Sequence, residues 1–159
     1  MLCVLFTVLI LSKMNKPLIT MIYSSPPAVV DRAIDLGLIR DNDRKTSSTK
    51  KALKRKWSAI IVFGIVLGVF VYFANGTHSF VSGFLTSYGL WLVVDWYDVL
   101  ILDIGWFCHS KKVIIPGTED MVDAYHDYWL HIKASCLGVL LGLPACLISG
   151  VFCQILGQV

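Results

Sequence analysis

Long apolar runs separated by short polar stretches dominate the chain and predict helices that cross a membrane. Residues 57–74 and residues 134–157 are two such runs, and neither contains a charged residue. A third run, residues 80–107, is apolar apart from three aspartates. Each run supplies the roughly 20 residues, range about 17 to 25, that a helix needs to cross a hydrocarbon core of about 30 Å. We therefore expect three membrane spans in this part of the chain.

The N-terminal stretch has a less regular pattern. Residues 2–11 and 18–23 are apolar, but Lys13, Asn15, Lys16 and Pro17 separate them. The positive charges follow the first apolar run instead of preceding it, which is the reverse of a secretory signal peptide. We expect an N-terminal membrane helix that is kinked at Pro17. The alternative is a chain whose true first residue is Met14 or Met21, which would lack this span.

These patterns predict an all-α integral membrane helical bundle of about four transmembrane helices plus a short interfacial amphipathic helix. The composition agrees, because the 159 residues are 56% hydrophobic and their mean hydropathy is +0.69, which is too apolar for a soluble domain of this length. The expected organisation is an N-terminal helix over 1–24, a basic loop with a short helix over 25–56, and a three-span bundle over 57–159 with a loop at 108–133.

The charge distribution predicts the orientation. Nine of the 14 Lys and Arg residues lie between Arg32 and Lys56. By the positive-inside rule, both loops face the cytoplasm and both termini face outside, in a bacterial cytoplasmic (inner) membrane. Five basic residues crowd the entry to the 57–74 span, where they either bind anionic lipid or act only as a topology signal: Lys50, Lys51, Lys54, Arg55 and Lys56. The basic loop lacks the aromatic platform of a nucleic-acid reader.

The acids of the third run are the first candidate site. Asp95, Asp98 and Asp103 lie in or at the end of an apolar helix, where each ionised group costs roughly 2.5 to 3.5 kcal/mol on insertion scales. If the helix continues to His109, its polar edge reaches from the membrane interior to the cytoplasmic surface. This layout is typical of a proton or cation path, or of a headgroup site. The alternative is a buried structural cluster.

The second candidate site lies on an amphipathic helix predicted between Pro116 and the last span, capped by Thr118. One face is aromatic and apolar, and we expect it to lie at the membrane interface. The opposite face carries Glu119, Asp120, Asp123, His126, Asp127 and His131. Asp127 and His131 are spaced as two metal ligands could be, but no tighter pattern such as H-E-x-x-H occurs. We expect a solvated acidic face, with no metal and no cofactor.

Small residues predict where the helices pack. Gly138, Gly142 and Gly150 recur at multiples of four in the last span, with Ala134 and Cys146 continuing the stripe. Gly64 and Gly68 repeat the spacing in the 57–74 span. Such stripes allow close helix approach in lipid. We expect these two spans to be neighbours, or the stripe to form a homodimer face.

Two sequence stretches carry a resemblance to a known group. The run IIPGTEDM followed by AYHDYWLHIK, together with DLGLI at residues 35–39, resembles small bacterial multi-pass membrane proteins of unknown function that have an I-P-G-T-E-[DG] motif before the last span. The resemblance implies a four-helix membrane protein and supplies no activity.

The function expected from these features is that of an interaction or accessory subunit of the membrane, with a membrane protein partner or a homo-oligomer. The IPGTED segment would be its cytoplasmic contact surface. The alternative is an ion- or proton-coupled transporter, or a membrane-embedded enzyme, that uses the intramembrane carboxylates. Motifs for hydrolase, P-loop and dinucleotide chemistry are missing from the sequence, so the residues name no reaction.

Overall fold

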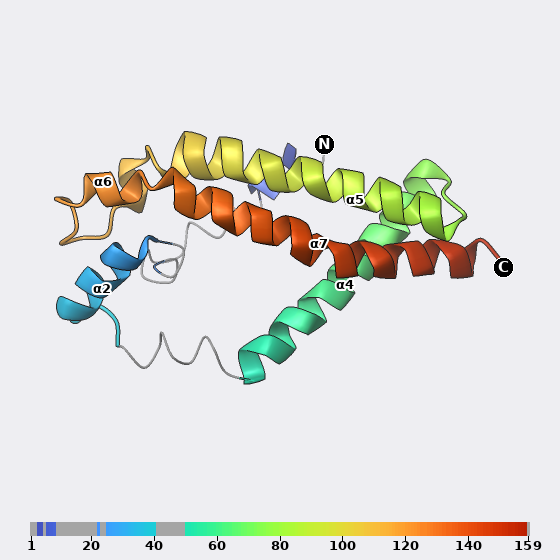
Figure 1. Cartoon of the computed structure of the whole chain (residues 1–159), viewed down its shortest axis with the longest axis horizontal. Coiled ribbons are helices and arrows are strands. Elements are labelled where there is room, and N and C mark those ends of the chain that lie inside the picture. The colour runs from blue at the N-terminus through green and yellow to red at the C-terminus, as the bar shows by residue number, and fades with distance from the viewer. Residues whose placement is uncertain (1–2, 5, 9–21, 23–24, 41–49, 159) are drawn as a thin grey trace. The chain divides into compact units, whose positions relative to one another are not determined.

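The computed structural model describes residues 3–4, 6–8, 22, 25–40 and 50–158, and within this part the chain is helical with no strand (Figure 1). In chain order the main elements are α2 (Pro27–Asp35), α4 (Lys50–Asn75), α5 (Phe80–Tyr97), the π-helix η3 (Asp98–Phe107), the 3-10 turn η4 (Lys111–Val113), α6 (Val122–Tyr125) and α7 (Tyr128–Leu156). The chain forms two compact units. The first contains residues 1–48 and 96–135, and the second contains residues 49–95 and 136–159.

In the second unit, α5 and α7 approach each other closely along the small-residue stripe of α7. A Cβ at Gly142 would collide with the indole of Trp91, and one at Gly138 would collide with the carboxylate of Asp95. The indole Nε1 of Trp91 donates a hydrogen bond to the carbonyl oxygen of Gly138 at 3.1 Å. Further along, a Cβ at Gly150 would lie 2.9 Å from the backbone oxygen of Phe80. The small-residue stripe of α7 is therefore the surface on which α5 packs.

Helix α4 contacts a different face of α7. A Cβ at Gly64 would lie 2.7 Å from the carbonyl oxygen of Ala145, and one at Gly68 would lie 3.1 Å from the Cβ of Phe152. Figure 1 shows α4 crossing α7 at this level. The two spans are neighbours, but the glycines of α4 pack on larger side chains of α7 while the stripe of α7 packs on α5.

Polar groups buried between these helices are paired. The hydroxyls of Ser87 on α5 and Ser149 on α7 lie 2.5 Å apart, and both residues are fully buried. The thiol of Cys153 approaches the carbonyl oxygen of Gly68 at 3.8 Å. Such bonds join helices whose contact surface is otherwise apolar.

Two helical segments are long and apolar enough to cross a membrane, by length and composition: Trp57–Asn75 and Val122–Leu156. The sequence led us to expect about four. The third expected span, residues 80–107, is helical throughout, but Asp95 and the hydroxyl-bearing residues of α5 lower its hydropathy. The first expected span, 1–24, lies largely outside the described residues.

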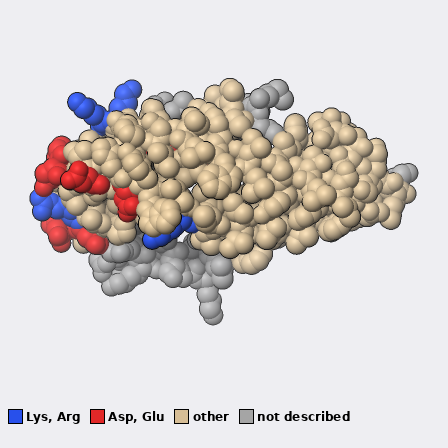
Figure 2. Space-filling model, turned by 45° about the horizontal axis from the view of Figure 1, so that its top comes forward, with Lys and Arg blue, Asp and Glu red and all other residues tan. Residues whose placement is uncertain are grey.

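The described surface of the second unit is apolar. The exposed fraction is 61% for Val62 and 74% for Phe73 on α4, and 61% for Leu140 on α7. In the view of Figure 2, acidic and basic side chains gather over the region of α2 and α6, while the surface of α5 and α7 carries few. Side chains of this size rarely stay exposed over so long a surface in soluble monomers.

The first unit has a small core under α2. Its buried members are Ile22, Val29, Val30, Ala33, Ile115 and Tyr125. Pro27 begins α2 at a position where its missing N–H costs no hydrogen bond. The helix ends in a Schellman motif: the N–H groups of Gly37 and Leu38 bond to the carbonyls of Ile34 and Ala33, and Gly37 adopts φ 71°. The stretch DLGLI therefore encodes a helix stop.

Candidate functional site

The IPGTED stretch forms a tight turn held by three groups. The hydroxyl of Thr118 donates to the carbonyl of Ile115 at 2.8 Å, and its oxygen lies 2.8 Å from the hydroxyl of Tyr125. Because the only hydroxyl proton of Thr118 is already used, the phenol of Tyr125 donates to it. The phenol oxygen in turn accepts the N–H of Ile115 at 3.0 Å. All three residues are buried, so the turn is fixed from inside.

This turn packs on α2. Gly117 has φ 89°, and a Cβ there would lie 2.6 Å from a methyl group of Leu36. The N–H of Gly117 donates to the carboxylate of Glu119 at 2.8 Å. Arg32 of α2 pairs with Asp120 at 3.8 Å across an exposed surface. The two sequence stretches that carry the resemblance, DLGLI and IPGTED, therefore contact each other.

The amphipathic helix predicted to begin after Thr118 does not form as one element. Thr118 bonds within the turn and caps no helix, α6 contains only four residues, and a break at His126 and Asp127 precedes α7. Asp127 instead caps α7, since its carboxylate accepts the N–H of Leu130 at 3.3 Å. The break occurs because the phenol of Tyr125 is drawn inward to the turn, which fixes the direction of α6.

The aspartates of the first candidate site do not all lie on one α-helix, because Asp98 and Asp103 belong to the π-helix η3. Its backbone bonds run from each N–H to the carbonyl five residues earlier, as in the 2.9 Å bond from Cys108 to Asp103. It ends at Phe107, so the helix that was expected to continue to His109 stops two residues before it. Asp98 begins η3, while Asp95 lies in the second unit beside Gly138.

Asp103 pairs with His131 within the first unit. Its carboxylate oxygen lies 3.0 Å from Nδ1 of the imidazole, and the His131 side chain is 8% exposed, against 34% for Asp103. Because a carboxylate can only accept, Nδ1 carries the proton of this bond. The ring of Phe107 packs edge-on against the imidazole at 5.8 Å.

The other imidazole nitrogen of His131 has no partner among the described residues. Nε2 is buried and makes no hydrogen bond to that part of the chain, although nearly all buried polar groups in proteins are paired. In the neutral imidazole this nitrogen is a bare acceptor, because the proton is on Nδ1. The site thus combines an oriented histidine, a carboxylate behind it and a free basic nitrogen in front.

Cys108 lies near this pair and is 4% exposed. Burial raises the pKa of its thiol to about 11, and the carboxylates of Asp103 and Asp127 add to the rise. A thiolate would have to form in an apolar, negatively charged surrounding. The thiol is therefore protonated, and unreactive, near neutral pH.

His109, His126 and Tyr128 form a second group of rings in the first unit. The ring centres of His109 and His126 are 5.3 Å apart, and Tyr128 stacks on His109 at 6.0 Å. Nδ1 of His109 bonds to the carbonyl oxygen of Ile104 at 2.9 Å, and its Nε2 lies 3.4 Å from the Tyr128 hydroxyl. The structure thus joins a histidine of the first predicted site to one of the second.

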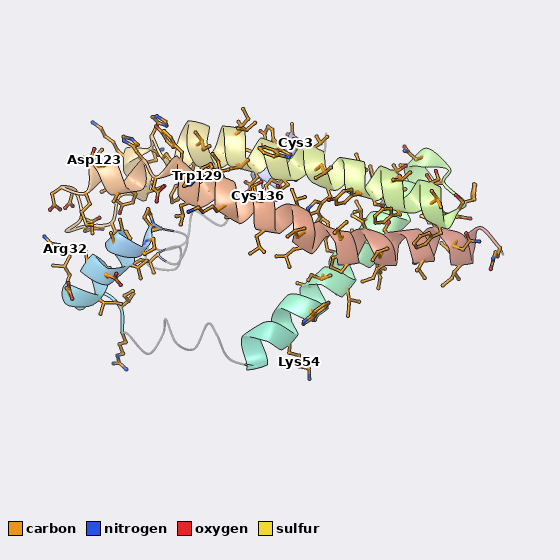
Figure 3. The ribbon with its side chains drawn as sticks, viewed as in Figure 1. Cys3, Arg32, Lys54, Asp123, Trp129 and Cys136 are labelled. Carbon is orange, nitrogen blue, oxygen red and sulfur yellow. The ribbon has the colours of Figure 1, made fainter. Side chains whose placement is uncertain are left out.

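The remaining predicted residues lie on the surface. Glu119, Asp120, Asp123 and Asp127 are exposed; Figure 3 labels Asp123 on α6 and Arg32 on α2. Of the five basic residues at the entry to α4, only the Lys54 side chain is described, and it is exposed. Within the described ranges, no three His, Cys, Asp or Glu side chains are grouped so as to hold a metal ion.

Sequence reasoning missed the structural roles of Tyr125 and Thr118 and the position of Cys108. Periodicity treats a residue only by its place on a helix, so it predicted a cap at Thr118 and did not predict the internal hydrogen bonds of Tyr125. Pro116 and Gly117 did signal a turn, and a turn of this kind needs internal hydrogen bonds. That requirement could have directed attention to the neighbouring hydroxyls.

Comparisons with protein-family models, with curated proteins and with solved structures found no match for the chain. The resemblance of the IPGTED region therefore stays a prediction.

Proposed function

We propose that the chain is a multi-pass protein of the cytoplasmic membrane in which Asp103 and His131 accept and release protons. The observation that carries this proposal is the buried Nε2 of His131, which has no hydrogen-bond partner within the described ranges, while Nδ1 is held by Asp103. This arrangement orients an imidazole and leaves it one basic nitrogen, which is what general acid–base groups and proton relays require.

The proposed membrane arrangement has four spans: the N-terminal stretch, α4, α5 continued by η3, and α7. The apolar segments Trp57–Asn75 and Val122–Leu156 support it, as do the exposed apolar side chains of α4 and α7. At the start of α7, the exposed Trp129 lies under the ammonium group of Lys133 at 5.9 Å. An aromatic ring paired with a cation is typical of the membrane interface.

The proposed chemistry uses only these two side chains. A proton arriving at Nε2 converts the imidazole into an imidazolium, and the carboxylate of Asp103 compensates its charge in the apolar surroundings. The proton then leaves from Nε2 again, or the Nδ1 proton passes to Asp103, which is 34% exposed and connects the buried ring to solvent. Either path serves a proton-coupled transporter or an acid–base catalyst.

The test is proton movement into liposomes that contain the full-length chain and a trapped pH dye. After an imposed pH step, the wild type should change the internal pH faster than empty liposomes do. His131→Gln and Asp103→Asn should each return the rate to that of empty liposomes, because Gln has no basic nitrogen and Asn cannot compensate a charge. Asp123→Asn, which removes an exposed carboxylate of the same unit, is the matched control and should keep the wild-type rate.

Wild-type liposomes that behave like empty ones, or variants that retain the wild-type rate, would contradict proton relay. An interaction or accessory role would then be the better proposal. The feature that favours it is the acidic turn, whose backbone is fixed by Tyr125 and Thr118 while the Asp120 side chain is 70% exposed. A preorganised acidic surface loses little conformational entropy when a basic partner binds.

A further inference from the structure

We propose that η3 converts between its π-helical form and an α-helical form, and that this conversion opens and closes the Asp103–His131 pair. The conversion would regulate proton movement, so its function rests on the proposed proton relay, but the two helical forms can be tested without it. Both η3 and His131 belong to the first unit.

The length of η3 is the first observation. π-Helices are rare and occur mostly as single turns within α-helices, whereas η3 runs over the ten residues Asp98–Phe107. It follows directly after α5, so an α-helical form needs only to continue the bonding of α5 past Tyr97. Because the rare backbone form is the less stable one, contacts made by side chains have to stabilise it here.

The apolar residues of η3 fit either form. Leu102 and Phe107 are buried, with exposed fractions of 7% and 8%, and they are five residues apart, which is the repeat of the π-helical bonds. In an α-helix they would lie about 140° apart around the axis. Trp106, which is half-buried, would then take the buried position, because Val99, Leu102 and Trp106 have the i, i+3, i+7 spacing of an α-helical face. Each form thus buries one large aromatic ring.

The side chain of His109 holds the end of η3 in the π-helical form. The N–H of Cys108 bonds to the carbonyl of Asp103 at 2.9 Å, five residues back, and an α-helix would direct it to Ile104. The carbonyl oxygen of Ile104 lies 2.9 Å from Nδ1 of His109. Because a carbonyl only accepts, Nδ1 carries the proton of this bond. The imidazole therefore occupies the acceptor that the α-helical form needs.

The conversion separates Asp103 from His131. An α-helix turns about 100° per residue and a π-helix turns less, so the difference accumulated from Asp98 to Asp103 is roughly one residue step. The carboxylate, now 3.0 Å from Nδ1 of His131, would then point to another side of the helix. The ring of Phe107, packed on the imidazole at 5.8 Å, would leave with it. The pair therefore exists only in the π-helical form.

The experiment observes Trp106 in the full-length chain in detergent by fluorine NMR, with 5-fluorotryptophan in place of tryptophan. Trp106→Phe assigns the signal. We expect exchange between two environments, of which the π-helical form is the more populated. His109→Ala frees the carbonyl of Ile104 and should raise the ratio of the α-helical to the π-helical form about fivefold, the usual net effect of one hydrogen bond.

Asp103→Ala tests the coupling between η3 and the pair. If the pair exists only in the π-helical form, breaking it must favour the α-helical form, because coupling between two equilibria is reciprocal. The variant should therefore raise the same ratio. Asp123→Ala removes an exposed carboxylate from the same unit and should leave the ratio unchanged. Circular dichroism checks the folding of each variant, and since His109 is exposed, His109→Ala decides alone if Asp103→Ala does not fold.

A single Trp106 environment in the wild type and in both variants would overturn the inference. An exchange that ignores His109→Ala and Asp103→Ala, or that Asp123→Ala changes equally, would overturn it too. The liposome assay is independent of these results. If proton movement fails while Trp106 responds as expected, the conversion stands and the relay is wrong. If protons move while Trp106 has one environment, only the conversion is wrong.

Discussion

Cys108, Asp103 and His131 lie close together in the first unit, yet their surroundings give them different roles. Cys108 is nearly buried and faces carboxylates that oppose a thiolate, so its thiol is chemically silent. His131 is almost as buried, and its Nδ1 is held by the carboxylate of Asp103. The same acid, Asp103, therefore opposes a thiolate at Cys108 and orients the imidazole of His131.

The thiol of Cys108 should react with iodoacetamide only at high pH. Its pKa of about 11 lies above that of a free thiol, about 8.5, so labelling should stay slow through pH 8 and accelerate towards pH 11. Because the raised pKa belongs to the folded chain, the stability it contributes is present below about pH 8.5 and is lost as the pH rises through about 11. Mass spectrometry of the Cys108 peptide measures the rate.

Asp103→Asn is the informative variant for Cys108. It removes one of the two carboxylates but leaves the larger cause, burial, in place. Labelling should therefore begin at a somewhat lower pH and still require alkaline conditions. A Cys108 that labels at pH 7 as fast as a free thiol would contradict the buried environment.

At the residue scale, the sequence predicted which side chains are candidate site residues but not which of them contact each other. Asp103, His109, His126 and His131 were all flagged, because charged and imidazole side chains near apolar helices are costly without a role. They were assigned to two separate sites. The pairs Asp103 with His131 and His109 with His126 arise from tertiary packing, which helical periodicity does not contain.

At the scale of the helix, the glycines of α7 matter because α5 approaches over them. Gly142 has the indole of Trp91 where a Cβ would lie, and that indole is bonded to Gly138. Gly89, on α5, has no heavy atom within 4 Å of the same position. These two glycines differ in packing and share their helical setting, so they form a matched pair.

Gly142→Ala should lower the free energy of unfolding by about 1 to 3 kcal/mol, the usual cost of overpacking. Gly89→Ala should leave it unchanged or raise it by up to about 1 kcal/mol, since Ala is the better helix former. Denaturant titration in detergent, followed by circular dichroism, measures both. Equal effects of the two substitutions would mean that α5 does not pack on Gly142.

Some helices were predicted correctly from the sequence and others were not. Apolar runs identified α4 and α7, because a span needs little more than length and hydropathy. The amphipathic helix after Pro116 was wrong, because a helical wheel looks the same whether or not the chain breaks. The break at His126 depends on the bonds from Tyr125 to Ile115 and Thr118. These three residues do not belong to one helical pattern, so a helical wheel does not predict their bonds.

At the scale of the whole molecule, the two units have different surfaces. The second unit exposes apolar side chains on α4 and α7. The first has a small core, a fixed acidic turn and most of the described ionisable groups. We propose on this basis that the second unit is embedded in the membrane and that the first meets water on the cytoplasmic side.

The proposed orientation predicts the behaviour of fusions to the C-terminal end of the chain. Alkaline phosphatase fused there should be active, because the enzyme folds only outside the cytoplasmic membrane. Green fluorescent protein fused at the same residue should be dark for the corresponding reason. Bright fluorescence together with an inactive phosphatase would place this end of the chain in the cytoplasm and overturn the proposed orientation.

The wide turns of η3 have a consequence for insertions and deletions. A helix that bonds each N–H five residues back holds a residue more than the α-helix that it interrupts. Deleting one residue between Asp98 and Leu102 would let the segment regain α-helical bonding. Asp103 would then keep its direction, because the narrower α-turn completes the same rotation with one residue fewer. A one-residue deletion within η3 should therefore preserve the pairing of Asp103 with His131.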